Sequence, residues 1–175
     1  MNNKKGKGVR VILFGLICST VFSYGCSLNV GVPQWSGSGF IRKEFLEYKK
    51  VAILLFENDP TGEVSDNFAL TFHEKFTQIE LIRRKELFNV LREQDLYPGQ
   101  LDEGTRIKIG KIFSAQALIM GNVYYPSILR WLMQIEIVDI ETNTIMGRSL
   151  VEINYMGAEG VKEACKLAVQ QLNVK

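Results

Sequence analysis

Residues 51–62 read VAILLFENDPTG, an unbroken apolar run followed by a polar segment with one Pro and one Gly. The run over 51–56 is typical of a strand buried on both faces, and the polar residues after it are typical of a turn. Phe then recurs every four residues, at Phe68, Phe72 and Phe76, which places one apolar stripe on a helix of about 14 residues. The segment therefore predicts a strand, a turn and a helix whose Phe side chains face the core.

A short strand and two further helices are predicted directly downstream. The apolar spacing predicts the strand over 79–82 and the helices over 85–94 and 103–113. In the last of these helices, Ile109 and Ile112 are expected to face inward.

Two strands and a turn are predicted in the second half of the chain. The apolar run 117–124 predicts a buried strand that Pro126 ends, and Gly121 within it indicates a bulge or a close approach to the backbone. Strict alternation over 129–139 predicts a half-buried strand. A turn containing Asn143 follows, because Asn tolerates the left-handed backbone of such turns.

The chain closes with a strand predicted over 145–155 and a helix predicted over 158–172. One face of this helix carries the apolar residues Val161, Cys165, Ala168 and Leu172. Cys165 is therefore expected to be a small buried residue rather than a reactive thiol.

The predicted order of elements is strand, helix, strand, helix, helix, three strands, helix. Helical crossovers in the first part favour parallel neighbours, and the consecutive strands favour an antiparallel meander. The sequence therefore predicts a single α/β domain, with a mixed β-sheet of about five strands flanked by about four helices.

The N-terminus has the order of an export signal. A basic segment over 4–10 precedes an apolar run over 11–22, and Cys26 follows the small residue Gly25. The apolar run is shorter than the roughly 20 residues that a membrane-spanning helix needs. The pattern resembles that of bacterial lipoprotein precursors, which implies removal of residues 1–25 and acylation of Cys26 with fatty acids such as palmitate.

Two residues depart from the usual lipoprotein pattern. Ser23 stands where such signals usually carry Leu, and Tyr24 stands where they carry a small residue. Ser23 and Gly25 also satisfy the small-x-small rule of an ordinary signal peptidase, which would release a soluble protein with a free Cys26. Cys18 is the weaker candidate for acylation because bulky residues precede it.

Residues 26–49 are predicted to be a lipidated N-terminus and tether. Residues 27–39 are rich in Gly and Ser and have no periodicity, which is typical of flexible linkers. Fully extended, the tether spans at most about 80 Å. The chain is thus divided into a lipoprotein signal peptide over 1–25, the tether over 26–49 and one periplasmic domain over 50–175.

The charge of the chain does not favour a nucleic-acid partner. Residues 1–25 hold four of the 21 Lys and Arg and none of the 19 Asp and Glu, so the mature chain has a formal net charge of −2, although the full chain has +2. No basic stripe remains in the mature sequence, and we expect no binding to nucleic acid.

The sequence offers no pattern typical of catalytic, cofactor-binding or metal-binding residues. The one histidine, His73, lies off the apolar stripe of its predicted helix and is expected to be exposed. A zinc site needs three or four ligands, and a Ser-His-Asp or Cys-His arrangement lacks further support here. Cys165 has no partner for a disulfide in the mature chain. We therefore expect no enzyme activity, no cofactor and no metal.

Four segments resemble, in order, the sequence pattern of the curli-secretion (CsgG-like) lipoprotein family. They are VAILLFENDPTG (51–62), LIRRKELFNVLREQDL (81–96), KIGKIFSAQALIMGNV (108–123) and IVDIETNTI (137–145). The resemblance implies a periplasmic domain whose mixed sheet is flanked by helices, in an arrangement like that of anticodon-binding domains. It also implies similarity to the amino-terminal domain of TolB and to LpoB, a lipoprotein activator of peptidoglycan synthases. None of these proteins is an enzyme.

The resemblance implies one favoured function and a location. The chain is expected to be a lipid-anchored protein on the periplasmic face of the outer membrane that binds other proteins during envelope assembly or secretion. Ser27 supports the outer membrane, because the common inner-membrane retention signal resembles Asp at that place. The expected partners are periplasmic or outer-membrane proteins, with homo-oligomers as one alternative.

Two alternative functions are also implied. One is a subunit of an oligomeric CsgG-like secretion pore, in which the hairpin that contains Trp131 enters the bilayer. This alternative lacks spare strands, because the core sheet uses every apolar strand of the mature chain. The other is an activator of a peptidoglycan synthase, against which the short tether over 26–49 argues, since such a lipoprotein must reach through the cell wall.

Overall fold

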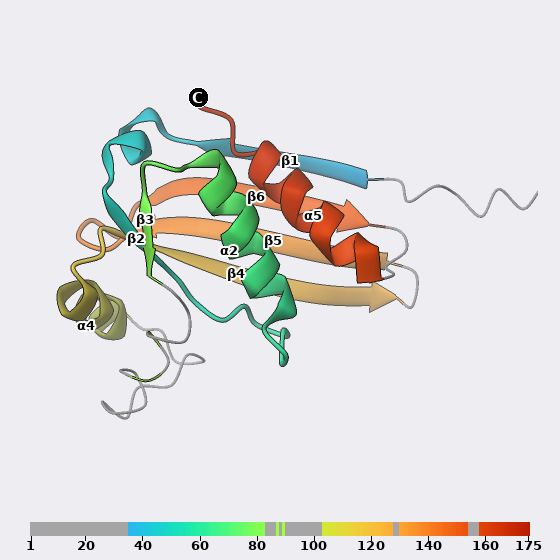
Figure 1. Ribbon diagram of the computed structural model, residues 1–175, viewed down its shortest axis with the longest axis horizontal. Coiled ribbons are helices and arrows are strands. Elements are labelled where there is room, and N and C mark those ends of the chain that lie inside the picture. The colour runs from blue at the N-terminus through green and yellow to red at the C-terminus, as the bar shows by residue number, and fades with distance from the viewer. Residues whose placement is uncertain (1–34, 83–86, 88, 90–102, 128–129, 154–157) are drawn as a thin grey trace, which may run out of the picture. The chain divides into compact units, whose positions relative to one another are not determined.

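A six-stranded sheet is the centre of the computed structural model, which describes residues 35–82, 87, 89, 103–127, 130–153 and 158–175. The strands are β1 (Trp35–Ile41), β2 (Lys50–Ile53), β3 (Glu80–Ile82), β4 (Ala117–Ser127), β5 (Arg130–Asp139) and β6 (Ile145–Ile153). The helices are the 3-10 helix η1 (Lys43–Glu47), α2 (Glu63–Lys75), α4 (Glu103–Phe113) and α5 (Ala158–Gln170) (Figure 1).

The sheet is mixed, with the strand order β1-β6-β5-β4-β2-β3. β2 pairs in parallel with β3 and β4, whereas β4, β5, β6 and β1 form a continuous antiparallel ladder. The predicted α/β class and mixed sheet are confirmed, and the described residues contain six strands instead of about five.

One face of the sheet is covered by α2 and α5, which lie in front of it in Figure 1. The Phe stripe of α2 is buried here as predicted, with the rings of Phe68 and Phe72 5.9 Å apart. α5 packs beside α2, and β5 contributes every second residue to the same core, namely Trp131, Met133, Ile135 and Ile137. The predicted alternation of β5 and the inward face of α5 are therefore confirmed.

The opposite face of the sheet is covered only in part. Ile109 of α4 packs with Ala52 of β2, Ile82 of β3 and Leu118 of β4 in a second, smaller core. The prediction that Ile112 faces inward is wrong, because 45% of this residue is exposed. α4 therefore covers β2, β3 and one side of β4, and the described helices leave this face of β5, β6 and β1 open.

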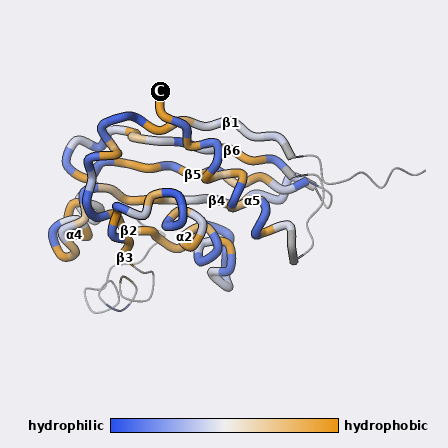
Figure 2. Tube along the Cα trace, turned by 45° about the horizontal axis from the view of Figure 1, so that its top comes forward, coloured by the Kyte–Doolittle hydropathy of each residue, from blue (hydrophilic) through white to orange (hydrophobic). Residues whose placement is uncertain are grey.

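β1 lies in a segment that was predicted to be part of the flexible tether, so the predicted start of the domain at residue 50 differs from the structure. Residues 35–41 pair with β6 along their whole length, from Trp35 opposite Ile153 to Ile41 opposite Gly147. Most of β1 is close to neutral in hydropathy (Figure 2), so the hydrophobic period that marks other strands is absent from it.

Two further predictions need comment. Pro126 does not end β4, which continues to Ser127, although the ladder with β5 shifts its register between Tyr124 and Ser127. Proline is tolerated at such an irregularity because the ladder hydrogen bond is already lost there. Most of the helix predicted over 85–94 lies outside the described residues.

A hydrogen bond from the Tyr48 hydroxyl to the carboxylate of Asp139 ties the start of β2 to the turn between β5 and β6. The other carboxylate oxygen of Asp139 accepts hydrogen bonds from the backbone N–H of Thr142, at 2.6 Å, and from its hydroxyl, at 2.8 Å. Burial acts to raise the pKa of Asp139, but the bonds from Tyr48 and Thr142 outweigh it and hold the pKa below its ordinary value.

We expect Tyr48→Phe to lower the free energy of unfolding by about 1–2 kcal/mol at pH 7. A carboxyl group whose pKa is lower in the folded state stabilises the fold above its unfolded pKa, and this stability is lost as the pH falls through the folded pKa. The difference between the wild type and the variant should therefore shrink below about pH 4. Urea unfolding at pH 7 and pH 3 measures both values, and a difference that is equal at the two pH values would contradict the assigned role.

Candidate protein-interaction surface

The described helices leave part of one face of the sheet uncovered, beside α4. Side chains alternate along a strand, so the residues of β5 between those that enter the core point to the opposite face. These are Leu132, Gln134 and Glu136, all half-buried. They mark the centre of a surface that is called the open sheet face below.

The register of the strands defines the open sheet face in three rows. The first row is Ser36, Glu152, Leu132 and Tyr124, the second is Ser38, Leu150, Gln134 and Asn122, and the third is Phe40, Arg148, Glu136 and Met120. The rows cross β1, β6, β5 and β4 in that order. Met120, at the β4 end of the third row, packs against the core under α4, so this row is open over three strands.

Two ion pairs flank the middle row. Nη2 of Arg148 lies 2.5 Å from Oε1 of Glu136, and Arg130 bonds Glu152 through two nitrogen atoms. Exposed pairs of this kind contribute only about 0–1 kcal/mol to stability. Their effect here is to hold charged side chains on either side of Leu150, which is 41% exposed. Apolar side chains framed by charged groups are typical of surfaces that bind other proteins.

The edge of β1 that faces away from β6 borders the open sheet face, and its Ile41 end is paired with the C-terminal segment. The backbone N–H of Ile41 donates to Asn173 at 2.9 Å, and the N–H of Lys175 donates to Ile41 at 3.0 Å, so the backbone groups of Ile41 point away from β6. Because this direction alternates along a strand, the backbone groups of Gly37 and Gly39 point the same way. No bond from them to another described residue outside the ladder is found. Such an edge accepts a further strand.

Gly39 of β1 is required by the close approach of Gln171, which follows α5. A Cβ atom added to Gly39 would lie 2.8 Å from the carbonyl oxygen of Arg148 and 2.9 Å from that of Gln171. Contacts below 3.0 Å force the backbone to shift, so the close approach of Gln171 excludes larger residues here. At position 39, the Gly that suggests a linker is therefore a packing requirement of an edge strand.

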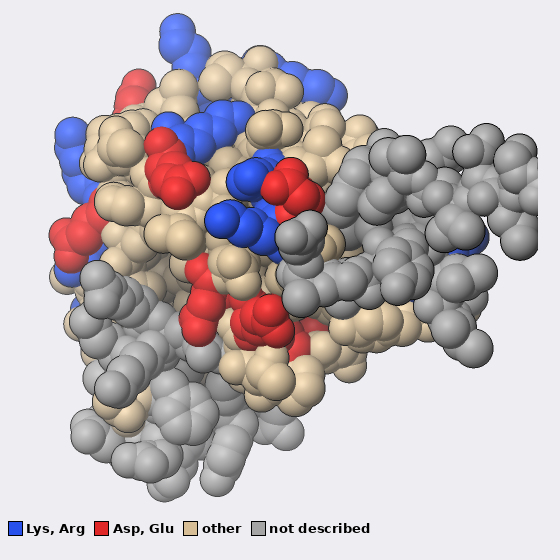
Figure 3. All heavy atoms as spheres, turned by 45° about the vertical axis from the view of Figure 1, so that its right-hand side comes forward, with Lys and Arg blue, Asp and Glu red and all other residues tan. Residues whose placement is uncertain are grey.

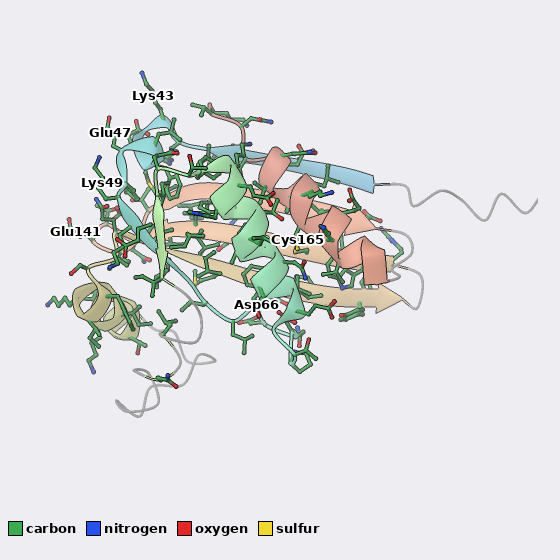
Figure 4. All side chains as sticks on the ribbon, viewed as in Figure 1. Lys43, Glu47, Lys49, Asp66, Glu141 and Cys165 are labelled. Carbon is green, nitrogen blue, oxygen red and sulfur yellow. The ribbon has the colours of Figure 1, made fainter. Side chains whose placement is uncertain are left out.

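Cys165 and Asp59 have structural roles. Cys165 points from α5 toward α2 (Figure 4), with Sγ 3.6 Å from the carbonyl oxygen of Val64. Burial, together with the charge of Asp59, raises the pKa of this thiol to about 12, so it stays protonated.

The Asp59 carboxylate accepts bonds from the backbone N–H and the hydroxyl of Ser65, at 2.8 and 2.7 Å, and so caps the first turn of α2.

The remaining sequence expectations concern single residues. His73 is exposed on α2 as predicted. Cys26, the predicted lipidation site, lies outside the described residues. Within the described ranges, no group of three or more His, Cys, Asp or Glu side chains is arranged to hold a metal ion. None of the helices in the described part of the chain has the length and hydropathy needed to span a membrane.

Charged side chains of both signs are interspersed on the face shown in Figure 3. Lys43, Glu47, Lys49 and Glu141 lie at one end of the sheet, opposite to the start of β1 (Figure 4). The open sheet face itself combines two ion pairs with exposed apolar residues. This mixture favours contact with a protein surface over contact with a polyanion.

The comparisons with known proteins agree with the predicted resemblance. The model of the family described as curli production assembly/transport component CsgG matches residues 57–125, less than half of the chain. This range includes two of the four segments on which the resemblance rests and part of a third. No curated protein matches the chain.

Three solved structures are similar to the chain. The PelC dodecamer from Paraburkholderia phytofirmans has 11% identity and a TM-score of 0.51, with 81% of this chain and 99% of that chain covered. The LpoB C-terminal domain from Salmonella enterica has 11% identity and a TM-score of 0.47, with 61% and 87% covered. The lipoprotein GNA1162 from Neisseria meningitidis has 12% identity and a TM-score of 0.48, with 63% and 82% covered. At these identities the likeness to PelC concerns the fold alone.

Proposed function

We propose that the chain is a lipid-anchored protein on the periplasmic face of the outer membrane, which binds other proteins during envelope assembly or secretion. The observation that carries the proposal is the match of residues 57–125 to the family described as curli production assembly/transport component CsgG. The export signal and Cys26 support the anchor, because a small residue and then a cysteine follow the apolar run.

The open sheet face and the β1 edge support a protein-binding role. An antiparallel sheet can leave one face open to solvent, and half of one face carries no described helix here, over the antiparallel strands. Leu150 is 41% exposed on that half. Burying it against a partner would remove apolar surface from water, and the flanking ion pairs would fix the orientation of the partner.

A homo-oligomer is the second component of the proposal. The PelC structure is described as a dodecamer, and its fold is shared by this chain. The outward backbone groups of Gly37 and Gly39, which bond to no other residue in the described ranges, offer an edge to which an extended segment of another copy can add. This supports self-association through β1 as one way in which the chain binds protein.

The two alternative functions have less support. A pore in which the Trp131 hairpin enters the bilayer would need Trp131 and Met133 to leave the core, where 2% and 0% of them are exposed. An activator of a peptidoglycan synthase needs a tether that is long enough to reach through the cell wall, but β1 already begins at Trp35. The tether is therefore shortened to residues 26–34, at most about 30 Å when extended.

The proposed role of the open sheet face is tested by a matched pair of variants, Leu150→Lys and Leu70→Lys. Both residues are exposed, Leu150 on the open sheet face and Leu70, at 58%, on α2, so neither change should unfold the domain. We expect Leu150→Lys to lower the yield of crosslinked partner in intact envelopes at least tenfold and Leu70→Lys to leave it unchanged. Equal yields from the two variants would remove the open sheet face from the proposal.

A further inference from the structure

The far end of β4 exposes two consecutive aromatic residues. Tyr124 is 42% exposed and Tyr125 is 60% exposed, and Pro126, which follows them, is also exposed. Large aromatic side chains usually bury most of their surface. The ring of Tyr125 lies 6.5 Å from that of the buried Trp131, so the end of the strand is held by the core. Tyr124, Tyr125 and Pro126 are called the aromatic tip below.

The two tyrosines lie on opposite faces of the sheet. Tyr124 pairs with Leu132 on the open sheet face, whereas Tyr125 packs toward Trp131 on the face that α2 and α5 cover. A partner docked against one face would reach only one of the rings. Both rings contact the same surface only when the end of the strand points toward it. The geometry therefore favours a flat, extended partner met end-on.

The aromatic tip lies at the end of the sheet where the chain enters the domain. Trp35, the first residue of β1, is level with Ile153 of β6, which is level with Trp131 of β5. The start of β1 and the end of β4 accordingly lie at the same side of Figure 1. Trp35 is nine positions after Cys26, a span of at most about 30 Å.

A lipid on Cys26 would thus place this end of the domain next to the membrane. A short tether keeps the tip at a local concentration of about the millimolar range, so that a weak contact is occupied. The charged group of Lys43, Glu47, Lys49 and Glu141 lies at the other end, away from the lipid (Figure 4). The length and the starting point of the tether therefore identify the partner that the aromatic tip meets first as the lipid surface.

The chemistry of the aromatic tip suits lipid headgroups. Tyrosine combines an apolar ring with a polar hydroxyl and is enriched at membrane interfaces for that reason. Residues 124–127 carry no charge. Arg130 on the neighbouring strand forms an ion pair with Glu152, and the Glu57 carboxylate accepts a hydrogen bond from the amide of Asn122. The contact would consequently depend on aromatic surface and would vary little with salt.

We propose that Tyr124 and Tyr125 rest in the headgroup layer of the membrane to which Cys26 is anchored, as a second contact that fixes the orientation of the domain. The inference rests on the proposed lipid anchor. In this orientation the strands point toward the membrane, so the open sheet face and the β1 edge stand upright and remain accessible to protein partners.

The test uses the full mature chain purified with its lipid and reconstituted into phosphatidylethanolamine and phosphatidylglycerol vesicles, with or without brominated phosphatidylcholine. Tyr125→Trp reports on the tip, and Ile112→Trp, at a residue that is 45% exposed on α4, is the matched control. Both are made in a Trp35→Phe background, whose own fluorescence is subtracted. Tyr125 is eight residues along β4 from Ala117, roughly 27 Å, and Ile112 precedes Ala117.

We expect bromolipid to reduce the fluorescence of the tryptophan at position 125 at least twofold and to leave that at position 112 unchanged. If bromolipid reduces the fluorescence equally at both positions in an acylated chain, the lipid contact is overturned and the anchor still stands. The same result is expected if a protein, rather than lipid, covers the aromatic tip. The intact mass of the same samples shows separately whether the chain carries acyl groups. A chain without acyl groups would overturn the proposed anchor, and the lipid contact with it.

Discussion

Gly121→Ala is expected to lower the free energy of unfolding by about 2–3 kcal/mol, because the new methyl group would overlap the ring of Phe56. A Cβ atom at Gly121 would lie 2.5 Å from Cγ of Phe56 and 2.6 Å from both Cδ atoms. The backbone of Gly121 is not in the left-handed region, so the effect is one of space alone. Phe56 is 2% exposed and its ring lies 5.5 Å from that of Phe68. Close packing therefore leaves the ring no room to withdraw.

Urea unfolding measures this change, and two further variants establish its cause. Gly37→Ala adds the same methyl group to an edge strand, where the nearest atom is the Leu150 carbonyl oxygen at 3.1 Å, so we expect a loss below about 1 kcal/mol. Phe56→Leu should cost less in the Gly121→Ala background than in the wild type, because the smaller side chain relieves the overlap. Strictly additive losses would show that the two residues do not compete for the same space.

Gly121 also marks how far the sequence predicts the fold. A lone Gly inside an apolar strand indicates that another group approaches the backbone closely, and this expectation is confirmed. The sequence could not name Phe56 as that group. β2 ends at Ile53, and the chain beyond it still bonds to β4, through Leu54 to Ile119 and Glu57 to Gly121. This irregular stretch turns Phe56 onto Gly121, and such a departure from the ladder has no signature in the hydrophobic pattern.

Strong periodicity was sufficient for the core elements and insufficient for the edge. The Phe stripe of α2 and the alternation of β5 are confirmed because each buries a continuous apolar face. Most residues of β1 are not buried in the core. Its Gly39 is required by the close approach of Gln171, which lies near the C-terminus of the chain. The spacing of apolar residues along α4 could not predict that Ile112 is exposed. This residue lies at the margin of the contact, because α4 covers only part of the sheet.

The open sheet face could not be predicted from the sequence for a related reason. Leu132, Gln134 and Glu136 are readily placed on the less apolar face of a strand. Which helix covers that face depends on packing between elements that are distant in the sequence. Local sequence patterns do not predict such packing. The predicted pairing of strands gave no reason to expect that α4 would stop short of β5.

Cys26→Ala is expected to move the protein from the membrane fraction to the soluble periplasmic fraction. The wild-type mature chain should have the mass of residues 26–175 plus three acyl chains, and the variant should lack this addition. Each buried methylene of an acyl chain contributes about 0.8 kcal/mol to membrane binding, so two or more chains give stable anchoring. The domain should remain folded, because Cys26 precedes β1, which starts at Trp35.

Cys18→Ala is the matched control for the anchor. Cys18 lies inside the apolar run over 11–22 and is removed with the signal under either cleavage route, so its replacement should leave the mass and the location of the mature protein unchanged. Acyl chains lost from both variants would point to a defect in export rather than to the loss of the modified residue. An unmodified wild-type chain in the soluble fraction would mean that cleavage follows the small residues Ser23 and Gly25, and the lipid-anchored function would then be rejected.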